Sequence, residues 1–155
     1  MPRRLPKPAN AQVSATMSRI RAKDTKPELL VRVHLHAAGL TGYRLHYAKV
    51  PGRPDIAFVN RKLAVFVHGC FWHGCPHCQP PKPKRNTWYW GPKLERNKER
   101  DSEKASALRK EGWRVVTLWE CAIKRSPEKQ VARVLRAYDA RKSARRSVSR
   151  KPRKN

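Results

Sequence analysis

The hydrophobic positions fall into short runs that are bounded by polar, proline and glycine residues. Residues 55–59 and 63–67 are two such runs, rich in Val, Ile and Phe, and a polar turn at residues 60–61 separates them. Runs of this composition around a tight turn predict a β-hairpin. Because the second run is apolar on both faces, we expect it in the interior of a sheet. Residues 43–47 and 113–119 predict two further strands.

Other segments carry the signals of helices. Thr25-Lys26-Pro27-Glu28 predicts a helix start, with Thr25 as N-cap and Glu28 completing a capping box, and Gly39 is a plausible stop. Three more helices are expected: a short one around Met17 and Ile20, a charged one over residues 93–111 that ends before Gly112, and a last one over residues 127–138. Residues 79–92 are rich in proline, basic and aromatic residues and predict an exposed loop. The order α-β-β-β-α-β-α favours an α/β or α+β fold with helices on a mixed sheet.

Length and composition favour one globular domain with basic ends. The chain has 155 residues, of which 39% are hydrophobic, which suffices for a single core. We expect a disordered arm at residues 1–12, the folded domain at 13–140 and a disordered tail at 141–155. No apolar run has the length of a membrane span, and the basic N-terminus lacks the hydrophobic stretch of a secretory signal. A soluble, cytoplasmic protein is expected.

The positive charge is large and is not confined to the ends. The formal net charge is +26, and residues 11–140 keep 26 basic and 11 acidic residues, a net charge of +15. A folded part that is basic in its own right indicates a polyanionic partner. Charge alone does not distinguish ribosomal binding, nonspecific DNA coating and enzymes that act on nucleic acid.

The cysteines have the spacing of a metal site. Three lie in one loop after the predicted central strand and the fourth follows the strand at 113–119: Cys70, Cys75, Cys78 and Cys121. Disulfides are disfavoured in a reducing cytosol, whereas four thiolates match the closed tetrahedral shell of structural zinc. His73 and His77 stand among them and could replace one thiolate. Free cysteines or a redox cluster are the alternative.

A second group of residues suits hydrolysis. Asp55 follows Pro54 at a strand start, and Mg²⁺ prefers such carboxylate oxygens together with water and phosphate. The dipeptide alone is explained simply by a turn residue beside Pro and Gly. His68 at the end of the partner strand and His73 nearby strengthen the hydrolytic interpretation, because imidazoles beside a metal-bound phosphate can take a proton from water.

Large aromatic residues stand in the segments predicted to be exposed. Phe71 and Trp72 lie within the cysteine loop, and residues 88–90 read Trp-Tyr-Trp among basic residues. Side chains of this kind can unstack a base step, and the cost is lowest at a mismatch. The alternative is that they pack over the cysteine loop or the last helix. Trp113 and Trp119 are expected in the core.

Taken together, these motifs resemble the very-short-patch-repair (Vsr) endonuclease family. The resemblance covers about residues 14–125 and rests on five segments, which are residues 17–28, the Val-Pro-Gly-Arg-Pro-Asp stretch at 50–55, residues 67–75, residues 97–101, and residues 112–121 with their Trp-Glu-Cys ending. It implies a restriction-endonuclease-like core, a mixed sheet flanked by helices, with an added structural zinc site.

The resemblance also implies roles for individual residues. Asp55 matches the catalytic, Mg²⁺-binding aspartate, and the backbone carbonyl of Val67 matches a further Mg²⁺ ligand. His73 matches the general base, His68 a catalytic-site histidine and Glu28 an active-site glutamate. The remaining matches are the zinc positions Cys70, Cys75, Cys78 and Cys121, the intercalating wedge Phe71, Trp72 and Trp90, and the DNA contacts Lys93 and Asn97.

Three positions depart from the family pattern or have a second explanation. Some members have Thr where Val67 stands, so only the carbonyl serves here. Others have His where Cys75 stands, and this loop is one residue longer, so His77 competes as a zinc ligand. Glu28 is fully explained as a capping-box residue without any chemistry.

The implied activity is Mg²⁺-dependent nicking of one DNA strand next to a thymine mispaired with guanine, the product of 5-methylcytosine deamination. The family pattern further implies a monomer in the bacterial cytosol or nucleoid, and it leaves open a mismatch-repair protein as a second partner. Two alternatives stay open, which are a zinc-stabilised DNA-binding protein without catalysis and a structure-selective nuclease of broader specificity.

Overall fold

The computed structural model describes residues 23–148, with side chains up to residue 140. The predicted arm at 1–12 and the helix expected around Met17 and Ile20 lie outside this range. In chain order the elements are α2 (Lys26–Ala37), β1 (Arg44–Leu45), β2 (Ile56–Phe58), η1 (Val59–Arg61), β3 (Leu63–His68), α3 (Cys70–His73), α4 (Thr87–Lys110), β4 (Arg114–Trp119), α5 (Glu120–Arg125) and α6 (Pro127–Val148). Among the described residues, no helix is both long and apolar enough to span a bilayer.

Four strands form one mixed sheet in the order β1-β2-β3-β4. The hairpin is confirmed, because β2 and β3 pair antiparallel with Ile56 opposite Val65, and η1 makes the turn. The interior position predicted for the second run is also confirmed, since β3 pairs with β4 along its other edge. That second pairing is parallel and brings His68 opposite Trp119, so both strands deliver the chain to the same edge of the sheet.

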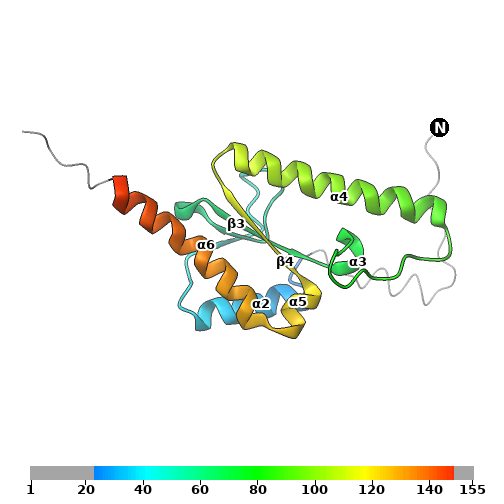
Figure 1. Ribbon diagram of the computed structural model, residues 1–155, viewed down its shortest axis with the longest axis horizontal. Coiled ribbons are helices and arrows are strands. Elements are labelled where there is room, and N and C mark those ends of the chain that lie inside the picture. The colour runs from blue at the N-terminus through cyan, green and yellow to red at the C-terminus, as the bar shows by residue number, and fades with distance from the viewer. Residues whose placement is uncertain (1–22, 149–155) are drawn as a thin grey trace, which may run out of the picture.

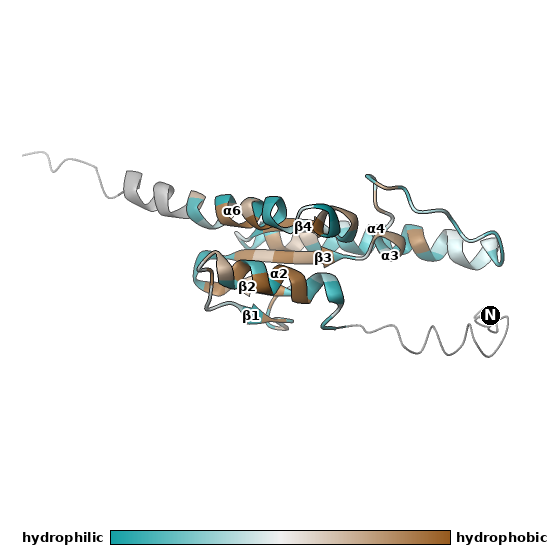
Figure 2. Ribbon diagram, turned by 90° about the horizontal axis from the view of Figure 1, so that it is seen from below, coloured by the Kyte–Doolittle hydropathy of each residue, from teal (hydrophilic) through white to brown (hydrophobic). Residues whose placement is uncertain are grey.

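Helices cover both faces of the sheet (Figure 1). On one face α2, α5 and α6 pack over a core that includes Leu35, Leu63 and Leu118, each fully buried. On the other face α4 packs through Leu108 against Trp113 and the neighbouring strand residues. In Figure 2 the hydrophobic colour follows β3 along its length. A strand buried on both faces reads as an unbroken apolar run, which is the pattern of residues 63–67.

The capping signals are confirmed. Thr25 is the N-cap of α2, and its hydroxyl accepts from the backbone N–H of Glu28. After α2, Gly39 has φ +75° and the N–H of Leu40 donates to the carbonyl of Leu35, which closes the helix. Gly112, with φ +78°, separates α4 from β4 in the same way. These left-handed positions are where glycine costs least.

Several elements differ from the prediction, and β1 and β2 are shorter than expected. Helix α4 begins at Thr87, so the predicted loop ends at residue 86 and the Trp-Tyr-Trp segment lies in the first turn of a helix that contains Pro92. The last helix continues to Val148 and includes the first part of the predicted tail. The short helix α3 lies where a loop was expected, and α5 covers residues to which no element was assigned. Proline removes a helical hydrogen bond, at a cost of about 3 kcal/mol, so Pro92 led the prediction to start this helix too late.

Candidate active site

The hairpin brings Asp55 to the end of β3. Gly52 and Arg53 both have positive φ, so the chain turns sharply immediately before this aspartate. The backbone N–H of Val67 then donates to Asp55 Oδ2 at 2.7 Å. Burial raises the pKa of Asp55, and the neighbouring carboxylate of Glu28 adds to this effect, whereas the Val67 hydrogen bond opposes it. Asp55 is therefore a carboxylate whose negative charge a nearby cation would stabilise.

The two predicted histidines form a stacked pair. The rings of His68 and His73 are 4.0 Å apart between centroids and nearly parallel, at 5°. His73 Nδ1 lies 2.6 Å from Asp101 Oδ2, and because a carboxylate only accepts, the ring N–H donates to it. Burial, together with the charge of His73, lowers the pKa of His68 to about 4. His68 is thus neutral at physiological pH, and Nε2 of His73 is the nitrogen left to exchange a proton.

Asp101 was not assigned a role in the sequence analysis. Burial by itself would raise its pKa, but the hydrogen bond and charge of His73 outweigh burial and lower it. Asp101 stands four residues after Asn97, inside one of the segments that carry the family resemblance. Two residues four apart on a helix share a face, so the spacing from Asn97 was the one feature of the sequence that could have indicated a role for Asp101.

Glu28 belongs to a buried polar network at the start of α2. Its side chain is almost inaccessible, and it accepts from the Thr25 hydroxyl and from the backbone N–H of Asp24, each at 3.1 Å. Arg32 lies 2.7 Å from Asp24 and 3.4 Å from Glu28. The network therefore combines the predicted cap with the ion pairs that Arg32 makes with Asp24 and Glu28.

His46, on the segment after β1, links this network to Asp55 and was also missed. Its Nε2 is 3.7 Å from Glu28 Oε2, and its Nδ1 is 3.9 Å from Asp55 Oδ1. The backbone N–H of His46 donates to the carbonyl of Asp55 at 3.1 Å. No motif pointed to this residue, because its contacts depend on the pairing of β1 beside β2.

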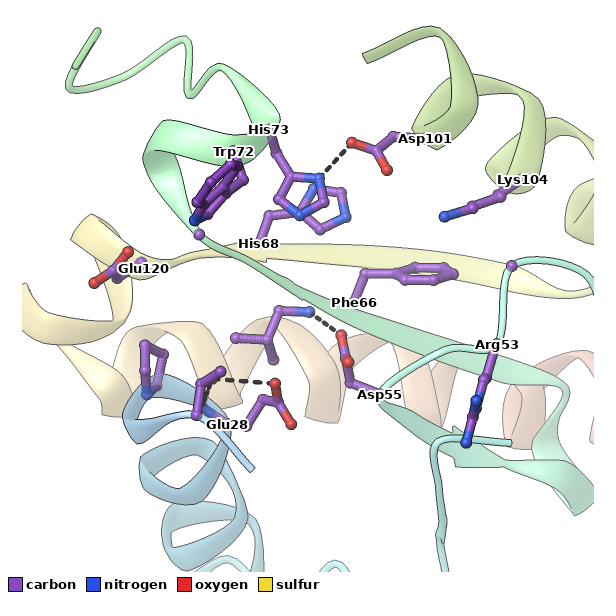
Figure 3. A pocket seen from close by; sticks show the side chains of 15 residues that line it. Glu28, Arg53, Asp55, Phe66, His68, Trp72, His73, Asp101, Lys104 and Glu120 are labelled. Atoms are coloured by element: carbon purple, nitrogen blue, oxygen red, sulfur yellow. Dashed lines mark hydrogen bonds and ion pairs between the residues drawn. The ribbon is translucent and has the colours of Figure 1, made fainter. Parts of the chain in front are cut away.

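One cavity of about 570 Å³ is lined by Glu28, Asp55 and the His73–Asp101 pair (Figure 3), whereas Asp24, Arg32 and His46 are not among its lining residues. The predicted hydrolytic residues all line it, and they are Glu28, Asp55, Val67, His68 and His73. Other lining residues are Arg53, Trp72, Asp101, Lys104 and Glu120. The donor atoms of His68, His73 and Asp101 lie within 4.8 Å of one another, and so do those of Asp24, Glu28 and His46. The cavity thus joins a proton-accepting imidazole to several carboxylates, which is a chemistry suited to hydrolysis.

The four cysteines converge at a separate place beside this cavity. Their sulfur atoms all lie within 4.8 Å of one another, and the sulfurs of Cys75 and Cys121 are 3.7 Å apart. The backbone N–H of Cys121 donates to the sulfur of Cys70 at 3.3 Å. His77 lies outside this group of sulfur atoms: its backbone N–H donates to Cys75, and its ring centroid is 6.4 Å from that of Trp119.

The predicted wedge residues form one aromatic cluster at the start of α4. Phe71 and Trp72, from α3, and Trp90 have ring centroids between 5.0 and 5.8 Å apart. Asn97 donates its side-chain amide to the carbonyl of Trp72 at 3.0 Å, so it holds α3 against α4. The ammonium of Lys93 lies 5.4 Å from the centre of the Tyr89 ring. The cluster is partly exposed, whereas Trp113 is buried in the core as expected.

Comparison with known proteins agrees with this chemistry. The sequence model of the family described as DNA mismatch endonuclease Vsr matches residues 7–79. The type II nicking enzyme V.XorIIP of Xanthomonas oryzae pv. oryzae is 49% identical over 109 residues, which cover 69% of this chain and 78% of that protein. The type II nicking enzyme V.NaeI of Lentzea aerocolonigenes is 44% identical over 120 residues, 74% of this chain and 71% of that protein.

A third relative carries the family's name. The DNA mismatch endonuclease Vsr of Escherichia coli K12 is 39% identical over 112 residues, which cover 72% of this chain and 70% of that protein. Identity of this size over most of both chains, together with a cavity of hydrolytic residues, leads to one conclusion. The chain belongs to the Vsr family of DNA mismatch endonucleases and is a DNA-cleaving hydrolase.

Proposed function

We propose that this protein nicks one strand of duplex DNA next to a thymine mispaired with guanine, in the very short patch repair of deaminated 5-methylcytosine. The observation that carries the proposal is the single cavity that gathers Asp55, Glu28, His68 and the His73–Asp101 pair in a chain of this family. The reaction is hydrolysis of a phosphodiester bond with the help of Mg²⁺.

The residues of the cavity fit a divalent cation. Asp55 uses one oxygen for the Val67 N–H, which leaves Oδ1 for a metal, and burial beside Glu28 makes its charge unfavourable without one. Asp55 and the backbone carbonyl of Val67 would hold Mg²⁺, as hard oxygen ligands do. When bound, Mg²⁺ supplies Lewis-acid polarisation of the scissile phosphate.

The protein's own residues supply the proton chemistry. Asp101 accepts the Nδ1–H of His73, so this ring presents Nε2 as the proton acceptor for the attacking water. His68 is neutral because it is buried, and its ring N–H can donate to a phosphate oxygen without adding charge. The stacking of the two rings fixes the plane in which both act.

Mismatch selection is assigned to the aromatic cluster of Phe71, Trp72 and Trp90. Its rings are partly exposed and sit next to the cavity, which Trp72 also lines. Unstacking a base step costs a few kcal/mol and least at a mismatch, so an intercalating wedge prefers a weakened pair. Phosphate contacts by basic residues, among them Lys93, then hold the duplex in register.

The four-cysteine site fits structural zinc. A tetrahedral Zn²⁺ with bonds of about 2.3 Å places two sulfurs roughly 3.8 Å apart, and Cys75 and Cys121 are 3.7 Å apart. Burial raises the pKa of the Cys70 thiol and the N–H of Cys121 opposes this, so a bound cation would be needed to hold Cys70 as a thiolate. Four protein thiolates leave no open position, so this metal would stabilise the fold and take no part in hydrolysis.

Three wider expectations belong to the same proposal. The fold is a restriction-endonuclease-like core, supported by the mixed sheet with helices on both faces. The protein acts as a monomer in the bacterial cytosol or nucleoid. A mismatch-repair protein is a candidate partner for recruitment to DNA.

The test is a nicking assay on labelled T:G duplexes in a panel of sequence contexts. Wild-type protein should nick one strand with Mg²⁺ and not with EDTA, and excess Mg²⁺ should restore activity. Asp55→Ala should abolish nicking and leave DNA binding largely intact, because it removes the metal-binding oxygen while the basic surface is unchanged. Glu128→Ala, which removes an exposed carboxylate of α6 outside the cavity, should nick like wild type.

Other outcomes have definite meanings. Wild-type nicking rates with Asp55→Ala would show that the site is assigned incorrectly. Equal nicking of a matched duplex would indicate the structure-selective nuclease, and tight binding without any Mg²⁺-dependent nicking would indicate the zinc-stabilised DNA-binding protein.

A further inference from the structure

Lys104 is a cation of the cavity to which the proposed chemistry gives no role. It stands on α4 three residues after Asp101, so the two side chains share a face of that helix. It lines the same cavity as Asp55, His68 and His73. Its charge acts through space on both Asp101 and His68. Figure 3 shows the side chain extending from α4 toward the two imidazoles.

The stem of Lys104 is fixed by the loop that precedes Asp55. A Cβ built on Gly52 would lie 2.8 Å from Cβ of Lys104 and 3.0 Å from its Cγ, so the lysine stem packs directly on the glycine backbone. Gly52 also has φ +77°, which side chains rarely adopt. The glycine thus allows a close approach of α4 to this loop, and the approach aims the ammonium into the cavity.

The ammonium itself is uncommitted. In the described part of the chain, Arg53 and Lys104 are the Lys and Arg residues that line the cavity. Arg53 donates its Nε–H to the carbonyl of His46 at 3.2 Å. Lys104 makes no hydrogen bond or ion pair with any described residue. A phosphodiester entering a cavity that holds Glu28, Asp55 and Asp101 meets several negative charges, and an available ammonium offsets that repulsion.

We infer that Lys104 binds a phosphate oxygen of the DNA strand that this enzyme cuts and draws that phosphate between Asp55 and His73. The inference rests on the proposed phosphodiester hydrolysis and assigns a substrate contact to a further residue of that site. No bond is made or broken at Lys104, since its contribution is an ionic hydrogen bond.

The first test is the salt dependence of DNA binding in magnesium-free buffer. Each phosphate contact contributes about 0.9 to the slope of log K against log salt concentration. Lys104→Gln should reduce that slope by about this amount, because it removes one contact of the basic surface. Lys104→Arg keeps the charge and should keep the slope. Lys110→Gln, an equal loss of charge on the same helix outside the cavity, should match wild type.

The second test locates the contact. Duplexes in which one phosphate at a time is replaced by an uncharged methylphosphonate are bound by wild-type and Lys104→Gln protein. When the methylphosphonate stands at one position near the cut, wild-type and Lys104→Gln protein should bind that duplex with equal affinity. The phosphate that has been neutralised there is the partner of the ammonium that the variant lacks. At distant positions the two losses should add.

Additive losses at every position, or an unchanged salt slope, would overturn the inference and leave Lys104 as a charge that only acts through space on Asp101 and His68. These readouts need no cleavage. If no duplex of the panel is nicked, the proposed function fails, and the comparison of Lys104→Gln with Lys110→Gln still decides whether the ammonium contacts phosphate.

Discussion

Among single residues, Asp101 decides which nitrogen of His73 can take a proton. Its carboxylate accepts from Nδ1 at 2.6 Å and fixes the tautomer. Asp101→Asn keeps the shape but loses the charge that stabilises a protonated ring. We expect the single-turnover nicking rate to fall on the order of a hundredfold, the size of a general-base contribution. DNA affinity in magnesium-free buffer should not fall below the wild-type value, because the substitution removes a negative charge, and an equal loss of affinity would contradict a role in proton transfer.

Residues of the site could be predicted where local motifs carry them. Asp55 follows a proline at a strand start, and His68 and His73 stand beside the cysteines, so their short spacing in sequence already suggested one site. Asp101 and His46 escaped because no short motif links them to His73, Glu28 or Asp55. Their roles depend on how α4 and β1 pack, which sequence spacing does not encode.

At the scale of elements, long periodic or strongly apolar segments were predictable and short ones were not. The hairpin and its buried second strand follow from a continuous apolar run, and α2 from its capping signals. The start of α4 was misplaced because Pro92 disfavours a helix when considered alone. Packing of Trp90 against Phe71 and Trp72 holds that first turn in helical form, and this tertiary contact outweighs the local preference.

The start of α4 should therefore matter for mismatch preference. Trp90→Ala removes one ring of the cluster, and stacking on a base is worth about 1–3 kcal/mol. We expect the preference for T:G over matched duplex to fall by about tenfold or more in competition binding. Trp88→Ala removes an exposed ring that makes no described contact with Phe71 or Trp72, so its preference should be close to wild type. Equal losses in both variants would show that the cluster has no special role.

At the scale of the whole molecule, the cysteine site ties two distant parts of the chain together. Cys70 and Cys75 belong to the segment after β3, whereas Cys121 lies in the first turn of α5, after β4. A metal held by all four thiolates would fix both strand exits, and with them the positions of α3 and the cavity. The sequence spacing predicted this group, and the structure brings its sulfur atoms together.

Removal of one thiolate should accordingly affect the whole fold. Cys75→Ser is expected to lose bound zinc, measured by elemental analysis, and to lower Tm markedly, because metal binding and folding are coupled. His77→Asn should keep its zinc and its Tm, since the ring of His77 lies against Trp119. The reverse result, with zinc lost only in His77→Asn, would make the histidine the fourth ligand.

The parallel pairing of β3 and β4 has an architectural consequence. Two neighbouring strands that point the same way require a long crossover to return the chain to its starting edge, and a tight turn is geometrically impossible. Here that obligatory return path is the segment from residue 69 to residue 113, and it contains three of the cysteines, the aromatic cluster and helix α4 with Asp101 and Lys104. The aromatic cluster, most of the cysteine group and the helix that carries Asp101 and Lys104 are therefore housed inside a connection that the topology demands in any case.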